Sequence, residues 1–535
     1  MKRALSLFFV LCMVMSLMLG LCSCGGDETT TTTTNPNAST TTQSGQTPGP
    51  GSPTADWPQF ENTKLKIQLS SYSDSEFTSG GQKYMAGPDG PSSDKVQNYV
   101  YERNLEAYAA LGIDMQNVEY LYLNKGWGNI STEIMTQEDA GSGCPDMYCD
   151  MIYDMMVATM NSCFYNVKNM TVESGKGYFN FAASDADGEF YLNEFMNDLT
   201  MSQDKMYLIG SQYYLDLIRG MFVMPINIDM YESKIGSIVN FYADIMDGKW
   251  TWDYLIDLCR RVFNDKKGDG STMDDTLVFA AETGGGKSAS GILYSTDIQL
   301  VDIHVDGNGY YSFSYKSQNQ DLYNIFNKIA KVFSTDGVVA VQEGGSTQEQ
   351  VDAIRKKFSE GTLLIGGSIL MGAVEDEVYQ EMKQGFGLIP NPKFTEDAGY
   401  NTLIHNVSKV GAISRNCTEN NRKAISAFIQ YCSENSRIIV NEYYNYAMKY
   451  KFTSDAGTAE MLDLIYANVV AVREKALDDL VGAWNTNAQK WHTLLISDSR
   501  DFRANADQIA TVYGTTTSLK RSVLATLGEK WKGLP

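Results

Sequence analysis

The residues of this 535-residue sequence that could do chemistry are mostly carboxylates and aromatic rings. It has three histidines, His304, His405 and His492, and none stands at metal-ligand spacing from a cysteine, an acid or another histidine. Zinc centres use clusters of such ligands, and nucleophilic triads need a histidine base beside an acid. The sequence therefore predicts no metal centre, no histidine-based hydrolase and no cofactor.

Carboxylates are too numerous here to indicate a particular reaction. The chain holds 65 Asp and Glu residues against 43 Lys and Arg. A glycosidase needs two carboxyl groups on either side of one bond, and many pairs in this chain could meet that requirement equally well. We therefore expect a protein that is not an enzyme and keep a hydrolase as a remote alternative.

Two segments imitate known motifs without completing them. Asp265–Asp275 (DKKGDGSTMDD) has the Asp and Gly spacing of a calcium loop, but Lys267 occupies a ligand position and Thr276 replaces the closing glutamate. We interpret it as a polar turn before a strand over 276–281, with calcium binding as the alternative. Gly284–Ser288 resembles a phosphate-binding loop, but Ala281 stands where that loop needs its first glycine.

The N-terminus has the pattern of a secretory signal. Lys2 and Arg3 precede an apolar run over 5–19 that carries no charge and is short for a membrane span. The residues that follow, Leu-Cys-Ser-Cys, resemble a bacterial lipobox and predict lipidation at Cys24, which would anchor the protein on the outer face of the cell membrane. An ordinary secretory signal remains the alternative. We assign 1–23 to the signal peptide.

The next segment, 24–59, consists mainly of Thr, Ser, Asn, Gly and Pro, including an unbroken threonine run at 29–34. Such a composition cannot bury enough apolar area to offset the entropy of ordering, so we predict a disordered tether. The remaining body of about 475 residues is too large for one core and predicts two lobes. A net charge of −22 argues against nucleic-acid partners. The sequence does not show whether the six cysteines of the body form disulfides, and we expect a buried free thiol at Cys259.

Periodicity predicts strands that alternate with helices through the body. We expect strands at 64–69 and 115–123, and helices at 96–111, 130–140, 321–333, 348–358 and 420–433. Two apolar runs with strand character, 205–215 and 220–231, precede a helix for which Thr251 is the N-cap. Trp250 and Trp252 should pack at the start of that helix. Alternating strands and helices predict a mostly parallel sheet with both faces covered.

Several segments resemble, in order, the extracellular solute-binding proteins (family 1) of carbohydrate ABC importers, and in places their clostridial-type members. They are Cys144–Asp150 (CPDMYCD), Lys249–Asp253 (KWTWD), Phe358–Ser368 (FSEGTLLIGGS), Phe386–Lys393 (FGLIPNPK) with Tyr400 downstream, the strand Val410–Ile413, and Tyr443–Tyr444 with Ala459–Ile465. The likeness extends from about Lys64 to about Leu495. No single segment is specific, but their order is.

The resemblance implies an α/β, two-lobed periplasmic-binding-protein-like fold of class II type, with discontinuous lobes joined by a hinge and a ligand cleft between them. We expect lobe 1 over 60–210, lobe 2 over 211–360, a return to lobe 1 over 361–405, and a C-terminal helical part of lobe 2 over 406–535. Crossings between the lobes are expected near 205–225, 355–370 and 400–415.

The candidate ligand-binding residues are those that would line this cleft. A sugar offers hydroxyl groups to carboxylates and amides and apolar faces to rings, and ligands of open α/β sheets bind beyond the strand ends. Trp484 and Trp491 are seven residues apart and could stack on a sugar, although core packing is the commoner use of such a pair. The candidates are Ser71, Tyr72, Asp74, Trp127, Asp150, Tyr153, Asp216, Arg219, Gly367, Ser368 and Trp484.

The sequence therefore predicts an extracytoplasmic solute-binding lipoprotein, monomeric, that captures an oligosaccharide and delivers it to the permease of an ABC importer. A peptide or a polyamine is the alternative ligand, and a cationic ligand would suit the acidic body. A surface lipoprotein that captures glycans without a permease is the alternative function.

Overall fold

The computed structural model describes residues 57–71, 82–125, 128–170, 178–186, 188–282, 287–297, 301–315, 320–341, 347–449, 456–470 and 530–535. All of them belong to one compact unit, Gly51–Pro535. The predicted signal peptide and most of the predicted tether lie outside the described residues. The packed body begins before the expected boundary at residue 60, because Trp57 is buried and its ring packs edge-on against Tyr431 at 5.3 Å.

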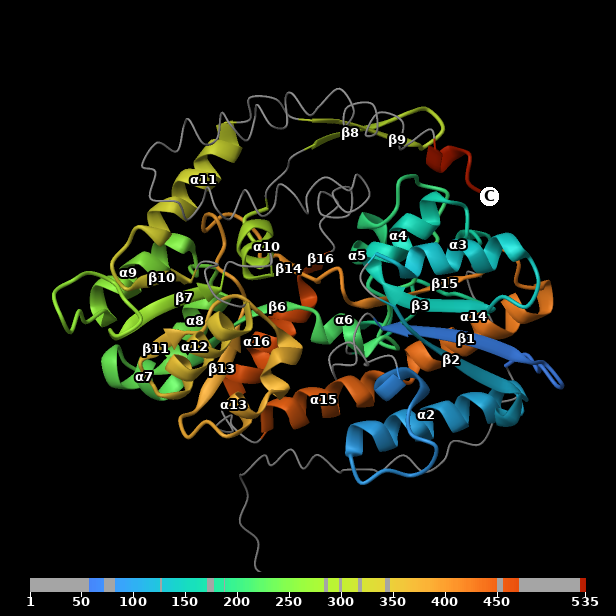
Figure 1. Ribbon diagram of the computed structural model, residues 1–535, viewed down its shortest axis with the longest axis horizontal. Helices are drawn as coiled ribbons and strands as arrows, with labels where there is room; N and C mark the ends of the chain where they lie inside the picture. The colour runs from blue at the N-terminus through green and yellow to red at the C-terminus, as the bar shows by residue number, and fades with distance from the viewer. Residues whose placement is uncertain are drawn as a thin grey trace, which may run out of the picture. The chain divides into compact units, whose positions relative to one another are not determined.

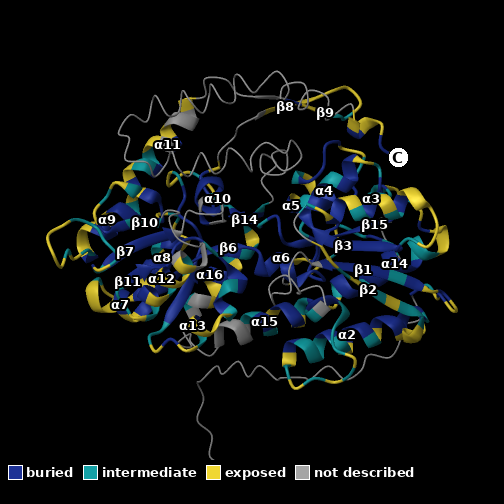
Figure 2. Cartoon of the chain, viewed as in Figure 1, coloured by how far each residue is buried: buried dark blue, intermediate teal, exposed yellow. Residues whose placement is uncertain are grey.

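A four-stranded sheet forms the core of the first half. Its order is β15-β3-β1-β2, with β1 parallel to β2 and β3, and β15 antiparallel to β3. Every residue of β3 is buried (Figure 2), as expected for a strand covered on both faces. The strands are β1 (Leu65–Ser71), β2 (Val118–Asn124), β3 (Met147–Met151) and β15 (Lys409–Ile413).

Helices cover both faces of this sheet (Figure 1). On one side, α2 (Lys95–Leu111) packs with α14 (Glu419–Glu434), and on the other α3 (Ile130–Ala140) packs with α4 (Ile152–Met160). The predicted helix over 96–111 is confirmed, and Gly112 ends it with a φ of 61°, a left-handed conformation that favours glycine. The predicted helices over 130–140 and 420–433 are confirmed too.

A second sheet forms the core of the second half, in the order β10-β7-β11-β6-β12, with β13 also paired to β6. β7 is parallel to β10 and β11, whereas β6 is antiparallel to β11, β12 and β13. The strands are β6 (Phe222–Asn227), β7 (Leu277–Glu282), β10 (Val338–Val341), β11 (Leu363–Ile365), β12 (Ile369–Leu370) and β13 (Phe386–Ile389).

The helix that follows Thr251 forms as predicted. The side chain of Thr251 accepts a hydrogen bond from the backbone N–H of Tyr254 at 3.2 Å and so caps α9 (Trp252–Val262). Trp250 and Trp252 are fully buried, and the Trp250 indole donates to the carbonyl of Pro390 at 2.9 Å. Their predicted role in packing is confirmed, and both lie in the core of the second half.

The other helices of the second half are α7 (Ile228–Lys234), α8 (Ile238–Met246), α10 (Lys287–Tyr294), α11 (Gln320–Phe333), α12 (Thr347–Ser359), α13 (Glu377–Gln380) and α16 (Ala456–Ala467). The predicted helices over 321–333 and 348–358 are confirmed.

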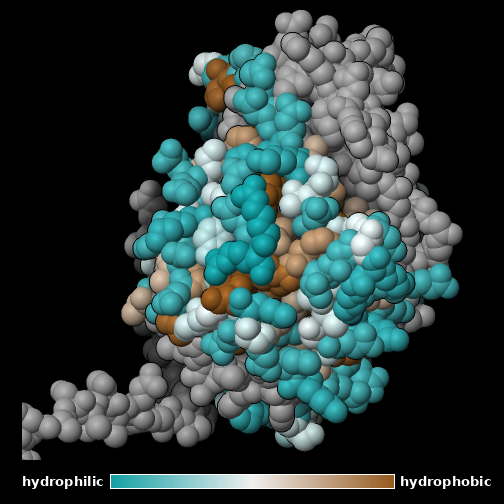
Figure 3. Space-filling model, turned by 90° about the vertical axis from the view of Figure 1, so that its left-hand side faces the viewer, coloured by the Kyte–Doolittle hydropathy of each residue, from teal (hydrophilic) through white to brown (hydrophobic). Residues whose placement is uncertain are grey.

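On the face of the molecule in Figure 3, hydrophilic side chains surround short hydrophobic stretches.

Two chain segments run side by side between the sheets. Residues 209–222 contain α6 (Leu215–Arg219) and lead from a bridge between Ile209 and Gly411 to the first residue of β6. Residues 402–409 connect β14 (Thr402–Leu403) to β15, and the N–H of His405 donates to the carbonyl of Gly220 at 2.9 Å. The predicted crossings near 205–225 and 400–415 match these two segments.

Other parts of the predicted layout differ from the sheet pairing. β11, β12 and β13 all pair with β6, so 361–389 lies in the second half, whereas β15 pairs with β3 and α14 packs on α2, so 409–434 lies in the first. The expected crossing near 355–370 stays within the second sheet. The first apolar run, 205–215, forms single bridges rather than a strand, and its last residue, Leu215, already begins α6.

The remaining described elements are mostly short, apart from α15. They are η1 (Gln82–Ala86), η2 (Met115–Asn117), η3 (Val167–Met170), η5 (Met371–Glu375), α5 (Asn193–Asp198), α15 (Arg437–Lys449), and the strand pairs β4 (Ser184–Asp185) with β5 (Gly188–Glu189), β8 (Val301–Val305) with β9 (Tyr311–Tyr315), and β14 with β16 (Val469–Val470). In the described residues, no helix is long and apolar enough to cross a membrane.

The six cysteines from Cys144 onward are free. Five of them are buried, and Cys144 is partly exposed. Burial raises the pKa of the Cys259 thiol to about 12, so this side chain acts as a small apolar group in the core, as predicted.

Candidate functional site

The candidate site begins at the carboxyl edge of the first sheet. β1 and β3 are parallel, so their last residues meet at one edge, where Asp150 lies beside Ser70. Asp150 is fully buried, and its Oδ1 accepts from the N–H of Met151 at 2.6 Å. Burial raises the pKa of this carboxyl to about 7, while these hydrogen bonds and the charge of Lys409 oppose the shift. We expected Asp150 to follow the third strand, but it is part of β3.

Asp150 is the first of five ionisable residues that follow one another in space. We call these five the buried charge chain: Asp150, Lys409, Asp216, Arg219 and Glu375. The Nζ of Lys409 lies 3.2 Å from the Oδ2 of Asp216, and Arg219 donates to the other oxygen of Asp216 at 2.9 Å. Arg219 also forms a two-point pair with Glu375, at 2.8 and 2.9 Å. The side chains of Lys409 and Arg219 are each 1% exposed, so both charges are balanced inside the protein.

The buried charge chain joins segments that are distant in the sequence. Asp216 and Arg219 lie on α6 in the crossing, Lys409 starts β15 in the first half, and Glu375 ends η5 beside the second sheet. Glu375 also accepts from the hydroxyl of Tyr443 at 2.6 Å. Each of these bonds depends on direction and distance. The buried charge chain therefore fixes how these segments meet at the crossing.

Asp154 organises the start of α3. It is fully buried in α4, and its Oδ1 accepts from the N–H of Ser131 at 2.8 Å. Burial raises the pKa of Asp154, and bonds from the N–H groups of Ser131, Gly128 and Ile130 oppose the shift. A carboxylate at a helix N-terminus satisfies N–H groups that have no partner inside the helix. Asp154 therefore holds the turn that leads into α3.

Tyr153 lies next to this turn. Its side chain is partly exposed, and a Cβ added at Gly128, where φ is 75°, would lie 3.8 Å from the tyrosine ring. The backbone N–H of Tyr153 donates to the carbonyl of Asn406 on the crossing, at 3.3 Å. Tyr153 thus combines an accessible ring with a fixed backbone.

Gly367 and Ser368 belong to the second sheet, between β11 and β12. Gly367 has a φ of 87° and leaves no room for a side chain, since an added Cβ would lie 2.8 Å from the carbonyl of Ala280. Ser368 is 1% exposed, and its carbonyl accepts from the hydroxyl of Ser288 at 2.6 Å. Both residues are packed closely into the sheet.

The candidate residues thus form three groups. The structure brings Asp150, Asp216 and Arg219 into one buried network, leaves Tyr153 at the edge of the first sheet, and keeps Gly367 and Ser368 on the second sheet. Ser71 is the last residue of β1, and its side chain is not described. Tyr72, Asp74, Trp127 and Trp484 lie outside the described residues, as does Trp491.

Two charged members of the network were missed in the sequence. Lys409 carries a signal, because it opens an otherwise apolar strand, Lys409–Ile413. A charged residue at the first position of a buried strand often indicates a buried partner. Glu375 carries no such signal, since its partner Arg219 is 156 positions away in the sequence.

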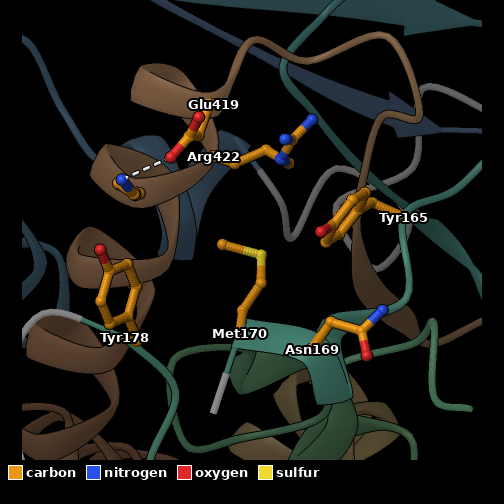
Figure 4. A pocket seen from close by; sticks show the side chains of 7 residues that line it. Tyr165, Asn169, Met170, Tyr178, Glu419 and Arg422 are labelled. Carbon is orange, nitrogen blue, oxygen red and sulfur yellow. Dashed lines mark hydrogen bonds and ion pairs between the residues drawn. The ribbon is translucent and has the colours of Figure 1, made fainter. Parts of the chain in front are cut away.

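A separate pocket lies at the opposite edge of the first sheet, where β3 begins. The N–H of Tyr165 donates to the carbonyl of Ile413, whose partner in the sheet is Met147, the first residue of β3. The pocket has a volume of about 290 Å³. Figure 4 shows Glu419 and Arg422 on one side, Met170 and Asn169 facing them, and the rings of Tyr165 and Tyr178 between. Its residues are Tyr165, Asn169, Met170, Tyr178, Glu419, Arg422 and Lys423.

The charged groups of this pocket already have partners in the protein. The guanidinium of Arg422 lies 4.3 Å from the centre of the Tyr165 ring and donates to the carbonyl of Cys417 at 2.6 Å. Lys423 pairs with Glu419 at 2.6 Å. We therefore prefer the carboxyl edge of the first sheet as the candidate ligand site. There the partly exposed Tyr153 and the buried Asp150 lie next to the crossing segments.

The turn over Asp265–Asp275 brings three carboxylates together. One oxygen each from Asp265, Asp269 and Asp275 lie within 4.8 Å of one another. However, Asp265 accepts from the N–H groups of Lys267 and Gly270 at 3.0 and 3.1 Å, and Asp275 accepts from two other N–H groups of the loop. These bonds hold the loop as a polar turn, which confirms the predicted conformation.

Comparisons with known proteins identify the fold. No family model matches the chain, and no curated protein matches it either. Among solved structures, a cyclo/maltodextrin-binding protein complexed with maltotetraose aligns with a TM-score of 0.51 and 10% identity, over 86% of this chain and 98% of that one. The maltose-binding periplasmic protein MalE of Listeria monocytogenes, in complex with maltose, aligns with a TM-score of 0.48 and 13% identity, over 86% of this chain and 98% of that chain.

The first of these alignments shows a shared fold at an identity too low to show more. The chain therefore has the two-lobed, mixed α/β fold of the periplasmic binding proteins, as predicted. Its two sheets, discontinuous in sequence and joined by paired crossings, are the two lobes.

Proposed function

We propose that this protein is an extracytoplasmic solute-binding lipoprotein, anchored through Cys24, that captures an oligosaccharide and delivers it to the permease of an ABC importer. The observation that carries the proposal is the fold shared over 86% of the chain with a protein named for binding cyclo- and maltodextrins. The order of family-like segments in the sequence points to the same class. The proposal includes no enzymatic turnover.

Ligand binding would use the edge where the first sheet meets the crossing. The partly exposed Tyr153 offers the apolar face of its ring to a sugar, beside the turn at Gly128 that Asp154 holds in place. The candidates Ser71, Tyr72, Asp74, Trp127 and Trp484 would complete this surface, together with Gly367 and Ser368 from the second sheet.

Asp216 and Arg219 have a different part in this proposal. Both are at most 5% exposed and are bonded to protein partners, so a ligand would have to displace those partners to contact them. We propose that they set the geometry of the crossing, about which the lobes would close on ligand.

Thermal unfolding tests the proposal. The chain from Gly25 onward is heated with mono- and oligosaccharides, and with peptides and polyamines as controls. A ligand at a hundred times its dissociation constant adds about 2.7 kcal/mol, which for a body of this size raises the midpoint by about 3 °C. A rise with a carbohydrate supports the proposal. A rise with only a peptide or polyamine contradicts the carbohydrate assignment and favours that alternative ligand.

The alternative function is glycan capture without a permease. It predicts the same rise in the unfolding midpoint with a carbohydrate, but no delivery of the sugar to a permease. Uptake of the bound sugar by cells that carry the gene, and its loss on deletion, supports delivery to a permease. Unchanged uptake after deletion, with binding intact, contradicts delivery.

A further inference from the structure

The hairpin of β8 and β9 is an insertion in the second half of the protein. It connects α10, which packs on β6 and β7, to α11, which packs on α9 and β10. Both flanking helices therefore belong to the second half of the protein. Figure 1 shows the hairpin extending from the side of α11 towards the C-terminus of the chain, beside α3 and α4.

The turn of this hairpin pairs with the first half. Tyr310 forms an antiparallel bridge with Ser202, in the segment that follows α5. Two backbone hydrogen bonds flank the bridge, from the N–H of Gln203 to the carbonyl of Gly309 at 2.9 Å and from the N–H of Tyr311 to the carbonyl of Met201 at 3.2 Å. Paired backbone bonds fix direction and register, so this contact is specific.

The segment that receives the hairpin is firmly part of the first half. Met201 is fully buried, in a hydrophobic cluster that contains the core of the first sheet and also reaches β7 and β11. Asn166 donates to the carbonyl of Asp204 at 3.2 Å and accepts from the N–H of Met206 at 3.0 Å. The side chain of Asp204 in turn accepts from the hydroxyl of Tyr310 at 3.3 Å.

The last residues of the chain also contact the hairpin turn. The ammonium of Lys532 lies 5.3 Å from the centre of the Tyr310 ring, within reach of a cation–π interaction. Trp531 is 1% exposed and packs edge-on against Tyr207 at 5.2 Å. The hydroxyl of Tyr207 donates to the carbonyl of Pro535 at 2.8 Å. Tyr310 thus lies between the first half and the C-terminal residues.

Hydrogen bonds within the hairpin itself shape its turn. Asp306 accepts from the N–H groups of Asn308 and Tyr310 at 2.8 and 3.0 Å, and Gly309 has a φ of 81°. An Asp that bonds the backbone ahead of it and a glycine with positive φ are features of a stable turn. Docking therefore orders few additional torsions, which favours a contact that forms and breaks reversibly.

We propose that the β8–β9 hairpin is a clasp, a non-covalent connection from the second half to residues 201–204 of the first half that limits how far the two halves separate. It is independent of the two crossing segments, since it joins the halves through a different part of each. The proposal concerns the connection between the halves and holds whichever ligand the protein takes.

A designed disulfide tests whether the clasp is docked in solution. Ser202 and Tyr310 face each other without bonding, and such antiparallel pairs have Cα atoms about 4.5 Å apart, within the range of a disulfide. Mild oxidation of the chain from Gly25 onward carrying S202C and Y310C should give one new intrachain disulfide in nearly all molecules. The control S202C with D302C, with the second cysteine at the far end of the hairpin, should give none. Equal yields in the two variants would overturn the proposal.

A second pair of measurements tests the restraint itself. Tyr310→Ala removes the hydroxyl bond to Asp204 and the ring beneath Lys532, at a partly exposed position that the fold tolerates. Hydrogen exchange of the Gln203 and Tyr311 amides should accelerate about tenfold or more, the effect of losing one or two hydrogen bonds. Tyr310→Phe keeps the ring and should show a smaller acceleration.

Small-angle X-ray scattering of the unliganded protein then reports the separation of the halves. The radius of gyration should increase in Tyr310→Ala and stay at the wild-type value in the oxidised S202C/Y310C variant. An unchanged radius in Tyr310→Ala, or wild-type exchange at both amides, would show that the hairpin does not restrain the halves and would overturn the clasp.

Discussion

Replacing Glu375 with alanine tests the buried charge chain at the residue that pairs with Arg219. The substitution removes both acceptors of the Arg219 pair and the acceptor of the Tyr443 hydroxyl. The guanidinium keeps its bond to Asp216. A buried arginine that loses a two-point partner is left with donors that water reaches poorly, and this is a strongly destabilising change.

The magnitude follows from the bonds lost and from their exposure. Hydrogen bonds to charged groups contribute about 1.5–3 kcal/mol each, so the two bonds to Arg219 alone give up to about 6 kcal/mol. The Glu375 side chain is 20% exposed, so water can replace part of what is lost. We therefore expect Glu375→Ala to lower the free energy of unfolding by about 3 kcal/mol.

Urea unfolding, followed by tryptophan fluorescence and circular dichroism, measures this change, with Glu377→Ala as the matched control. Glu377 lies two residues away and is exposed, so its removal should change stability by less than about 0.5 kcal/mol. A loss for Glu375→Ala no larger than that of the control would refute the conclusion that the charge chain holds the crossing.

Three further predictions concern other parts of the fold. Because burial raises the folded-state pKa of Asp150 to about 7, this carboxyl favours the folded state at low pH, and its contribution is lost as the pH rises from about 4 to about 7. Asp150→Asn should therefore exceed the wild type in urea unfolding by about 1.5 kcal/mol at about pH 5 and by about 4 kcal/mol at about pH 8; equal differences at both pH values would contradict this. Gly220→Ala places a Cβ 1.8 Å from the Ser408 Oγ and should cost about 1–3 kcal/mol, most of which the second change Ser408→Gly should restore; no recovery would contradict the assigned contact. Thr251→Ala should lower stability by about 1 kcal/mol, whereas Ser237→Ala, at an N-cap whose side chain makes no capping bond, should have little effect; equal losses would contradict the capping role.

The sequence predicted local features well, because their causes are local. The N-cap at Thr251 and the glycine that ends α2 depend on residues within one helical turn. The packing of Trp250 and Trp252 followed from their place at the start of an amphipathic helix. The fold class followed from the order of family-like segments, and the shared fold confirms it.

The pairing of distant segments was harder to predict. Periodicity shows that Leu363–Ile365 and Phe386–Ile389 are strands, but it does not show that both pair with β6, because any buried strand offers the same apolar faces. For the same reason, the predicted return of 361–405 to the first half does not match the sheet pairing.

The candidate site was predicted in part. Asp150 could be found because it lies near the end of a strand, and Asp216 and Arg219 because they lie in the crossing, but the partners Lys409 and Glu375 could not. Lys409 and Glu375 come from segments that meet only in the folded chain. Whether these residues contact ligand or only fix the crossing depends on burial, which the sequence does not give.

Isothermal titration calorimetry of the chain from Gly25 onward, with an oligosaccharide series, tests the central claim most directly. The account predicts saturable binding of one oligosaccharide per chain, weakened at least tenfold by Tyr153→Ala at the carboxyl edge and unchanged by Tyr165→Ala in the pocket at the opposite edge. Binding that Tyr165→Ala abolishes and Tyr153→Ala leaves intact would contradict the assigned site. The absence of heat with every carbohydrate, beside clear heat with a peptide or polyamine, would contradict the proposed function.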